Sequence, residues 1–337
     1  MKLVALALAA ASALSVSVSR APSGLEAGDS WSAVVVVKRD GRPAAAGRVS
    51  VYVGGRSFAA RAVGRGRYRA QVTLPAPGRY AYGARVRGRS YRGGTLTVRP
   101  VRLHGTYDVA VAADGSLLIG DSSNRVFRYR NGRLEVLARL RFPVEVAPDP
   151  RGGVGVVHQE RYVRHVAEDG STRVVAELEQ PTAHAYAADG TLFVSELGGR
   201  VRRVDPSGAV TTLIASGLNR PHGLAVIGRT LYVCDTFDHE LLSVDVAGGT
   251  VRTLTRDLNT PVDVAAGPDG ALYVADYGNG RIARVTQTGE TTTWVALVGV
   301  NGVAVAPDGT VYATERDRPR VLRVDAATRA VTTAVGS

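Results

Sequence analysis

Three histidines, three acids and one asparagine stand at or beside the start of short apolar runs that recur along the chain. They are His104, Asp108, Glu145, His184, His222, Asp263 and Asn301. Imidazole nitrogens suit zinc, whereas carboxylates suit calcium or magnesium. If the runs converge on one axis, His104, His184 and His222 could hold a divalent metal ion (Zn, Ca or Mg), and the other residues could bind a ligand. His222 is the candidate catalytic residue, as a base or as a metal ligand.

The same residues have a structural alternative. Side chains at the start of a strand often hydrogen-bond to backbone groups of the neighbouring sheet, and a histidine in a channel can do only that. A second set of acids recurs after another apolar run and is predicted to cap turns. These acids are Asp121, Glu196, Asp235, Asp276 and Glu315. The sequence has no glycine-rich phosphate loop, nucleophile elbow or zinc-cysteine motif, so whether the site is catalytic stays open.

The spacing of the apolar runs explains how such distant residues could meet. The residues aligned at the start of each innermost strand are Asp108, Glu145, Ala183, Gly223, Asp263 and Gly302, and subtraction gives steps of 37, 38, 40, 40 and 39. A repeat of about 40 residues with four short strands is typical of a β-propeller. One such sheet cannot bury both of its faces alone, so the sheets must stack radially and close. Six units fill residues 101–337, which predicts an all-β, six-bladed β-propeller.

The fifth unit shows the predicted strands most clearly. They cover residues 262–265, 271–276, 281–285 and 290–295, with a tight turn at Asp269-Gly270 between the first two. Residues 269–282, and residues 114–126 in the first unit, resemble the NHL repeat. The resemblance implies the propeller architecture but no particular activity, because this fold serves receptors, lyases, lactonases and inert platforms.

Two further resemblances concern the candidate site. Arg220-Pro221-His222-Gly223-Leu224 resembles the Pro-His-Gly segment of virginiamycin B lyases and peptidyl-amidoglycolate lyases, which place histidines in or near the channel, and residues 195–201 are similar to the lyase repeats. Residues 301–309 resemble a metal-ligand segment of the gluconolactonase and regucalcin family. However, virginiamycin B lyases have seven blades, and neither family's full set of functional residues can be matched here. The resemblances imply a metal-dependent lyase or lactonase acting at the channel mouth.

Residues 21–100 differ in composition from the rest of the chain. They hold 15 Arg and Lys against 3 Asp and Glu, a net charge of +12, whereas residues 101–337 hold 25 against 27, a net charge of −2. Short β-rich runs alternate with Gly and Pro turns, which predicts a basic β-sandwich. The pattern resembles bacterial extracellular immunoglobulin-like modules. Its charge could attract an anionic cell-wall polymer; nucleic acid is not expected as a partner of an exported protein.

The first residues predict export. Lys2 precedes an apolar run to about Val16, and small residues occur at Ala11-Ser12-Ala13, as in a secretory signal peptide. We expect residues 1–20 to be this signal, with cleavage after Ala13 or a few residues later, and no transmembrane helix in the mature protein. Cys234, the only cysteine, cannot form an intramolecular disulfide and is predicted to be buried.

The favoured hypothesis is a secreted or cell-surface binding protein, acting as a monomer. It would bind a protein or a small-molecule ligand at the mouth or rim of the propeller channel. The alternatives are the metal-dependent lyase or lactonase, with His222 supported by His184, His104 and Asp263, and a scaffold without a small-molecule site.

Overall fold

The computed structural model of the chain describes residues 14–27, 29–74, 76–158, 161–316 and 318–336. The chain divides into two compact units, Met1–Val101 and Arg102–Ser337. The predicted boundary at Pro100 lies beside this division. Most of the predicted signal peptide, residues 1–13, lies outside the described residues.

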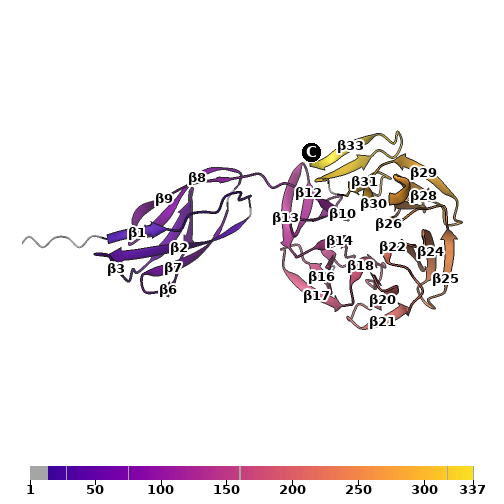
Figure 1. Cartoon of the computed structure of the whole chain (residues 1–337), viewed down its shortest axis with the longest axis horizontal. Coiled ribbons are helices and arrows are strands. Elements are labelled where there is room, and N and C mark those ends of the chain that lie inside the picture. The colour runs from indigo at the N-terminus through magenta and orange to yellow at the C-terminus, as the bar shows by residue number, and fades with distance from the viewer. Residues whose placement is uncertain (1–13, 28, 75, 159–160, 317, 337) are drawn as a thin grey trace, which may run out of the picture. The chain divides into compact units, whose positions relative to one another are not determined.

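The first unit, called here the front module, contains two antiparallel sheets (Figure 1). One sheet has the order β1 (Leu14–Val18), β2 (Ser30–Arg39), β7 (Arg67–Thr73) and β6 (Arg61–Gly64), with β3 (Arg42–Pro43) also paired to β2. The other has the order β5 (Arg56–Ala59), β4 (Val49–Val53), β8 (Gly78–Val86) and β9 (Arg89–Val98). These strands correspond to the β-rich runs that the sequence predicted for this module, but β1 lies at the end of the segment that the sequence assigned to the signal peptide.

Alternation of buried and exposed residues builds the core of the front module. In β7, Tyr68, Ala70 and Val72 are buried while the residues between them are exposed. Strand β1 packs against the same core through Leu14, Val16 and Val18. The apolar run therefore has two parts: its end, which the sequence suggested was signal peptide, forms an edge strand of the sheet.

The second unit contains six four-stranded antiparallel sheets in the described residues, each built from consecutive strands and arranged in a ring (Figure 1). This is a β-propeller. In chain order the sheets are β10 (Thr106–Val111), β11 (Leu117–Asp121), β12 (Arg125–Arg130), β13 (Arg133–Arg139); β14 (Pro143–Pro148), β15 (Val154–His158), β16 (Tyr162–Val166), β17 (Thr172–Glu177); β18 (Pro181–Tyr186), β19 (Leu192–Glu196), β20 (Arg200–Val204), β21 (Val210–Ile214); β22 (Pro221–Ile227), β23 (Thr230–Asp235), β24 (Glu240–Asp245), β25 (Val251–Thr255); β26 (Pro261–Ala266), β27 (Leu272–Asp276), β28 (Arg281–Val285), β29 (Thr291–Ala296); and β30 (Val300–Val305), β31 (Val311–Glu315), β32 (Arg320–Val324), β33 (Val331–Gly336). A single 3-10 turn, η1 (Tyr277–Asn279), interrupts the strands of this described region.

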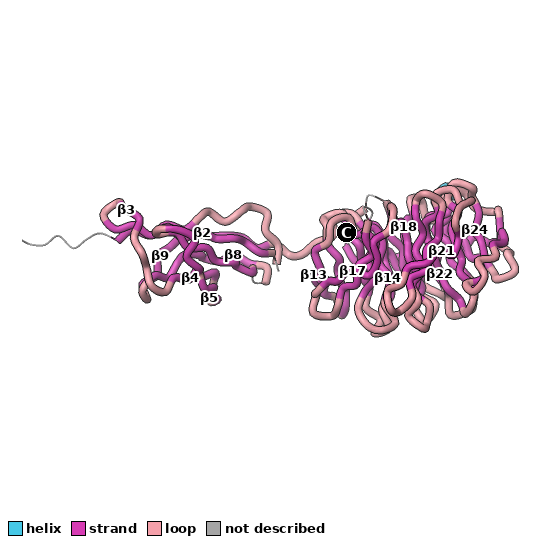
Figure 2. The backbone as a smooth tube through the Cα atoms, turned by 90° about the horizontal axis from the view of Figure 1, so that it is seen from below, coloured by secondary structure: helices cyan, strands magenta, loops and turns pink. Residues whose placement is uncertain are grey.

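The order of strands within each sheet places the candidate site. The first strands (β10, β14, β18, β22, β26 and β30) line the centre of the ring, and the fourth strands form its rim (Figure 1). Because the strands of all the sheets run between the same two ends, the loops gather at those ends (Figure 2). One end therefore collects the loops that lead into the innermost strands together with the loops between second and third strands. We call this end the mouth.

Packing between neighbouring sheets explains why the second strands are the most apolar. All five residues of β11, β15, β19 and β27 are buried, because the adjacent sheets cover both faces. Cys234 in β23 is fully buried in one of these layers, as predicted, and burial raises the pKa of its thiol. The described residues contain no helix long and apolar enough to cross a membrane.

Side chains at the mouth close the ring between the sixth and first sheets. The amide of Asn301 donates to the Tyr107 carbonyl (2.6 Å), and the Thr314 hydroxyl donates to the same oxygen (3.1 Å). The Thr106 backbone N–H donates to the Arg318 carbonyl (3.2 Å). Asn301, a candidate ligand-binding residue from the sequence, thus joins the sixth sheet to the first.

Candidate functional site

The six residues aligned from the sequence occupy one equivalent position at the mouth end of the innermost strands. They are Asp108, Glu145, Ala183, Gly223, Asp263 and Gly302, and each strand has its register irregularity just before or at this position. The irregularity tilts the start of each innermost strand relative to its neighbour. The repeat spacing therefore placed the centre of the propeller correctly.

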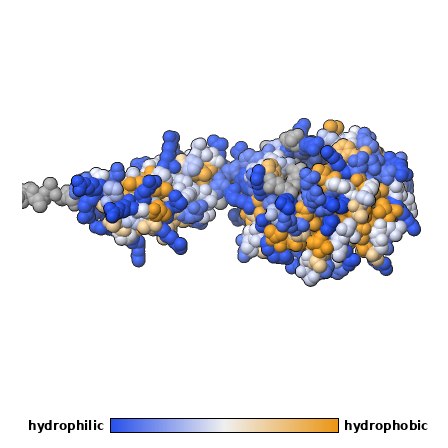
Figure 3. Space-filling model, turned by 60° about the horizontal axis from the view of Figure 1, so that its bottom comes forward, coloured by the Kyte–Doolittle hydropathy of each residue, from blue (hydrophilic) through white to orange (hydrophobic). Residues whose placement is uncertain are grey.

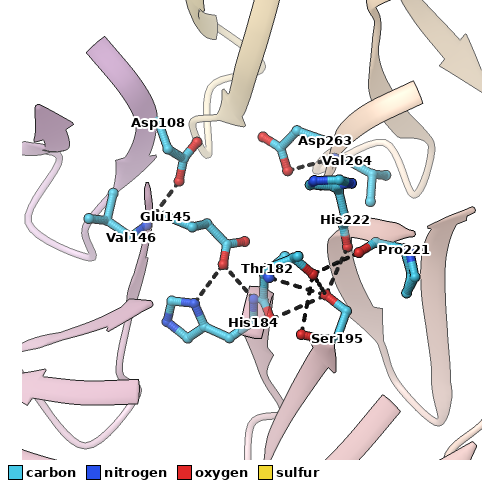
Figure 4. A network of polar contacts seen from close by, with 11 residues as sticks. Asp108, Glu145, Val146, Thr182, His184, Ser195, Pro221, His222, Asp263 and Val264 are labelled. Carbon is cyan, nitrogen blue, oxygen red and sulfur yellow. Dashed lines mark hydrogen bonds and ion pairs between the residues drawn. The ribbon is translucent and has the colours of Figure 1, made fainter. Parts of the chain in front are cut away.

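The three acids at this position connect neighbouring sheets. The Val146 backbone N–H donates to Oδ2 of Asp108 (3.0 Å) (Figure 4). The Val303 N–H donates to Oδ2 of Asp263 (2.7 Å). In the same way the His184 N–H donates to Oε2 of Glu145. Each carboxyl group thus accepts a backbone hydrogen bond from the next sheet. All three acids therefore make the structural contact that the sequence allowed as an alternative to ligand binding.

Burial and mutual repulsion govern the charge of these acids. Burial, followed by the negative charges of Asp263 and Glu145, raises the pKa of Asp108 well above its usual range. Burial and the charge of Asp263 likewise raise the pKa of Glu145. Burial raises the pKa of Asp263 to about 6, against the backbone hydrogen bonds that favour its ionised form. The centre of the ring is therefore a place where negative charge is costly.

His184 is a buried structural residue. Its Nδ1 lies 2.8 Å from Oε2 of Glu145, and its side chain has no exposed surface. Its ring fits because position 155 is glycine: a Cβ there would lie 2.4 Å from Nε2 of His184. Burial lowers the pKa of His184 to about 4, so the ring is neutral at pH 7. His184 is not available to a ligand in this arrangement.

His222 differs from His184 because it is only partly buried and its tautomer is fixed by its partners. Its Nδ1 lies 3.0 Å from the Arg220 carbonyl and 3.1 Å from Oγ1 of Thr236. A carbonyl can only accept, and the Thr236 hydroxyl already donates to the Pro261 carbonyl (2.8 Å). Nδ1 of His222 must therefore carry the hydrogen. Nε2 is left with an unprotonated lone pair and no hydrogen bond to a described residue.

Two arginine–aromatic pairs lie at the mouth, and the charges of both arginines act on His222. The Arg220 guanidinium carbon lies 5.3 Å from the centre of the Phe237 ring, and that of Arg316 lies 5.4 Å from the centre of the Tyr277 ring. Burial lowers the pKa of His222, and the positive charges of Arg220 and Arg316 lower it further. Although these residues come from the fourth, fifth and sixth sheets, the arginines act on one imidazole. We call His222, Arg220, Arg316, Phe237 and Tyr277 the mouth site.

The mouth site combines exposed positive charge with accessible apolar surface. Arg220, Arg316 and Phe237 are exposed, and Phe237 shows 47% of its surface. Guanidiniums held over aromatic rings keep their hydrogen-bond donors free for a ligand. The site can therefore attract an anion, donate hydrogen bonds to it and accept one hydrogen bond at Nε2 of His222.

The three histidines do not assemble into a metal site. His104 is exposed, and its Nδ1 lies 2.9 Å from a guanidinium nitrogen of Arg125, while His184 is buried against Glu145. Among the described residues, no group of three or more His, Cys, Asp or Glu side chains could hold a metal ion. The acids also accept backbone hydrogens, so the donor set present does not fit the metal centre that the family resemblances imply.

Four acids of the second set bind the loop that leads into the innermost strand of their own sheet, and Asp121 also caps the turn that follows it, as predicted, by accepting the Ser123 N–H (2.8 Å). Asp121, Glu196, Asp235 and Asp276 accept the backbone N–H groups of His104, Glu179, Asn219 and Asn259, respectively. Glu315 instead pairs with Arg320.

Asp235 differs from its counterpart in the fifth sheet. In the fourth sheet Glu240 stands opposite Asp235 in the strand pair, whereas the fifth sheet has Arg281 opposite Asp276. Burial, then the charges of Asp238 and Glu240, raise the pKa of Asp235 to about 6.

Sequence reasoning missed four of the five mouth-site residues. Only His222 was a candidate; Arg220, Arg316, Phe237 and Tyr277 occupy loops whose conservation a single sequence does not show. A usable signal existed, because an aromatic residue follows the capping acid by one or two positions in the fourth and fifth units (Asp235 to Phe237, Asp276 to Tyr277). That spacing places both rings in loops at the mouth.

Comparisons with known proteins agree with the class of fold. The NHL repeat family matches residues 258–284, within the fifth unit. Three solved structures share the fold: a catalytically inactive His-to-Ala variant of virginiamycin B lyase from Staphylococcus aureus with quinupristin (TM-score 0.54, 15% identity, 69% of this chain and 86% of that chain), the nidogen/laminin complex (0.60, 18%, 65% and 92%) and a gluconolactonase from Xanthomonas campestris (0.57, 17%, 64% and 84%). The protein is thus a β-propeller protein that contains an NHL repeat.

Sequence similarity places the chain more narrowly. It is 32% identical over 198 residues to the virginiamycin B lyase of Nocardia farcinica, covering 55% of this chain and 68% of that protein. The chain belongs to the virginiamycin B lyase family. It is also 28% identical over 171 residues to mouse teneurin-4, covering 43% of this chain but only 6% of that protein.

Proposed function

We propose that the protein is a ligand-binding propeller that takes an anionic ligand with an apolar body at the mouth site. The observation that carries this proposal is the setting of His222: a neutral imidazole whose Nδ1 is bound, whose Nε2 is unused, and whose pKa is lowered by burial and by the charges of the exposed Arg220 and Arg316. The guanidiniums would bind a carboxylate or similar anion, and Phe237 and Tyr277 would contact the apolar part. The six sheets would be the six blades of this propeller, and the front module an immunoglobulin-like β-sandwich.

Matched small ligands test this binding function. N-acetylphenylalanine carries a carboxylate beside an aromatic ring, and its amide has the same shape without the charge. We expect calorimetry to show the acid binding about tenfold more tightly than the amide, because a charged hydrogen-bonded pair contributes about 1.5–3 kcal/mol. The double variant Arg220→Gln/Arg316→Gln should remove this preference.

Controls separate the mouth site from general charge and folding effects. Arg229→Gln removes an exposed arginine from a turn at the opposite end of the fourth sheet and should leave binding unchanged. His222→Ala should weaken binding while changing the melting temperature little, because Thr236 keeps its bond to the Pro261 carbonyl. Equal affinity for acid and amide would contradict an anionic ligand.

Family membership favours a second candidate, a lyase acting at the same site. The inactive relative described above carries a histidine-to-alanine change, so a histidine matters in that enzyme. Here Nε2 of His222 could accept a proton, and Arg220 and Arg316 could stabilise the negative charge left on oxygen in an elimination. Chromatography of quinupristin incubated with the protein decides: conversion by the natural protein but not by His222→Ala would establish the lyase, and no conversion by either favours binding alone.

We also propose that the protein is exported and that its signal peptide is removed directly after Ala13. Leu14, Val16 and Val18 pack against the core of the front module, so cleavage further along would remove strand β1 and expose the edge of β2. Sequencing the mature protein should give Leu14 as its first residue. A mature protein that begins at Ser19 or later, or one that keeps Met1, would contradict this prediction.

A further inference from the structure

The outer face of the five-stranded sheet in the front module concentrates positive charge. In β7, Arg67 and Arg69 alternate with the buried residues and point away from the core, and cross-strand pairing sets Arg61 of β6 directly beside Arg69. Lys38 lies on the same face of β2, in register with the outward Ser15 of β1. We call Lys38, Arg61, Arg67 and Arg69 the cationic face.

Among the described residues of this sheet, no acid lies on the cationic face. The other outward residues of this sheet are serine, valine, glutamine, threonine, glycine and proline. The flanking turn contains Asp40, but Arg39, Arg42 and Arg65 flank the sheet as well and are exposed. In the part of the chain that the structure describes, none of the four cations of the face forms an ion pair with an acid. By contrast, arginines of the propeller such as Arg128, Arg200 and Arg284 are paired with acids.

The arrangement costs stability in the free protein. Arg61 and Arg69 are directly opposite each other on adjacent strands, where like charges repel and destabilise the sheet. Hydrophilic residues predominate on the face of the front module seen in Figure 3, but solubility alone requires no such concentration of one sign on one sheet. A bound anion would relieve the repulsion.

We propose that the cationic face binds a linear phosphodiester polymer that lacks bases, such as a poly(glycerol phosphate) chain. Arg67 and Arg69 are two residues apart on one face of a strand, about 7 Å, and Arg61 lies about 5 Å from Arg69 across the strands. Such a row suits an anion that repeats along a chain, and arginine binds phosphate oxygens in a bidentate manner.

The composition of the face favours a polymer without bases over nucleic acid. Binding of single-stranded nucleic acid uses aromatic side chains on which bases stack. The outward residues of this sheet include no aromatic side chain among those described, since Trp31 and Tyr68 point into the core. The proposal does not depend on the mouth site, which lies in the other unit.

Two triple variants of the whole protein test the proposal. The variant Arg61→Gln/Arg67→Gln/Arg69→Gln removes three charges from the cationic face. The matched control Arg79→Gln/Arg85→Gln/Arg92→Gln removes three exposed arginines from β8 and β9 of the other sheet, so the net charge changes equally. We expect the first variant to bind poly(glycerol phosphate) at least tenfold more weakly in low salt, and the control to stay within about twofold of the natural protein.

Salt dependence and melting separate binding from folding. The slope of log affinity against log salt should fall by about 2 in the first variant, since each lost contact removes about 0.7 from the slope. Its melting temperature should stay constant or rise, because the Arg61–Arg69 repulsion is gone. Equal losses in both variants would overturn the proposal, as would tighter binding of heparin or of a single-stranded poly(dT) than of poly(glycerol phosphate).

Discussion

Replacing Glu145 by alanine is expected to lower the free energy of unfolding of the propeller by about 2–4 kcal/mol. The carboxyl oxygen Oε2 accepts the backbone N–H of His184 and lies 2.8 Å from its Nδ1, and both groups are buried. Alanine would leave them without a partner and without water. Chemical denaturation followed by fluorescence or circular dichroism at pH 7 measures the loss.

Glu145→Gln is the matched control, because both hydrogen bonds go to one oxygen that an amide oxygen can replace. We expect this variant to stay within about 1 kcal/mol of the natural protein at pH 7. Burial raises the pKa of Glu145, so the folded protein binds more protons than the unfolded chain above the usual glutamate pKa, and stability falls as pH rises through that window. The glutamine variant lacks this loss, and its relative stability should increase with pH. Equal destabilisation by alanine and glutamine would contradict the interpretation.

Replacing Gly223 by alanine is expected to destabilise the propeller by about 3 kcal/mol. A Cβ at this position would lie 2.4 Å from Cα of Asp263 and 2.7 Å from the Val264 nitrogen. Both are backbone atoms of the fifth sheet, so the clash cannot be relieved by rotating a side chain. The fourth and fifth sheets would have to separate at the centre of the ring. Thermal unfolding of the variant measures the effect.

Gly198→Ala is the corresponding control. This glycine lies in a loop of the third sheet, a Cβ at its position would meet no other atom within 4 Å, and its backbone does not adopt a left-handed conformation. Alanine there should leave stability unchanged or raise it slightly, because it restricts the unfolded chain. If Gly223→Ala has the same melting temperature as the natural protein, the close approach of the two sheets at the centre of the ring is wrong.

The repeat pattern predicted the elements of the propeller closely. The predicted strands 262–265, 271–276, 281–285 and 290–295 correspond to β26, β27, β28 and β29 within one residue at every boundary. Period and turn chemistry suffice here because each unit repeats the same pattern. Strand β1 was missed because its five residues, Leu14–Val18, end the apolar run that begins after Lys2. Their alternation of apolar residues and serine fits an edge strand as well as the end of a signal peptide.

The candidate site was harder to predict because equivalent positions hold residues with different roles. The sequence identified His184 and His222 alike, but one ring is buried against Glu145 and the other is accessible beside Thr236. The two histidines differ in environment for two reasons. Gly155 makes room for the His184 ring, and a loop of the sixth sheet brings the charge of Arg316 to bear on His222. Such packing and long-range proximity leave no periodic signal in one sequence.

The carboxylates at the centre of the ring and the residues of the mouth site have different roles. Asp108, Glu145 and Asp263 join neighbouring sheets, and their raised pKa values disfavour further negative charge at the centre. Arg220 and Arg316 place positive charge at the mouth instead. An anionic ligand would therefore be held at the mouth rather than drawn deep into the channel, which is consistent with an exposed binding surface.

Long-range nitrogen–proton correlation spectra of the protein with ¹⁵N-labelled histidine report on the state of His222 itself. The six histidines give six ring systems, and the His222→Gln variant identifies the one that belongs to His222. We predict that at pH 7 its hydrogen is on Nδ1 and its Nε2 is unprotonated, that N-acetylphenylalanine shifts its signals more than the amide does, and that Zn²⁺ or a chelator leaves them unchanged. A hydrogen on Nε2, or a shift caused by metal rather than by the anion, would show that the mouth site does not bind anions through a neutral His222.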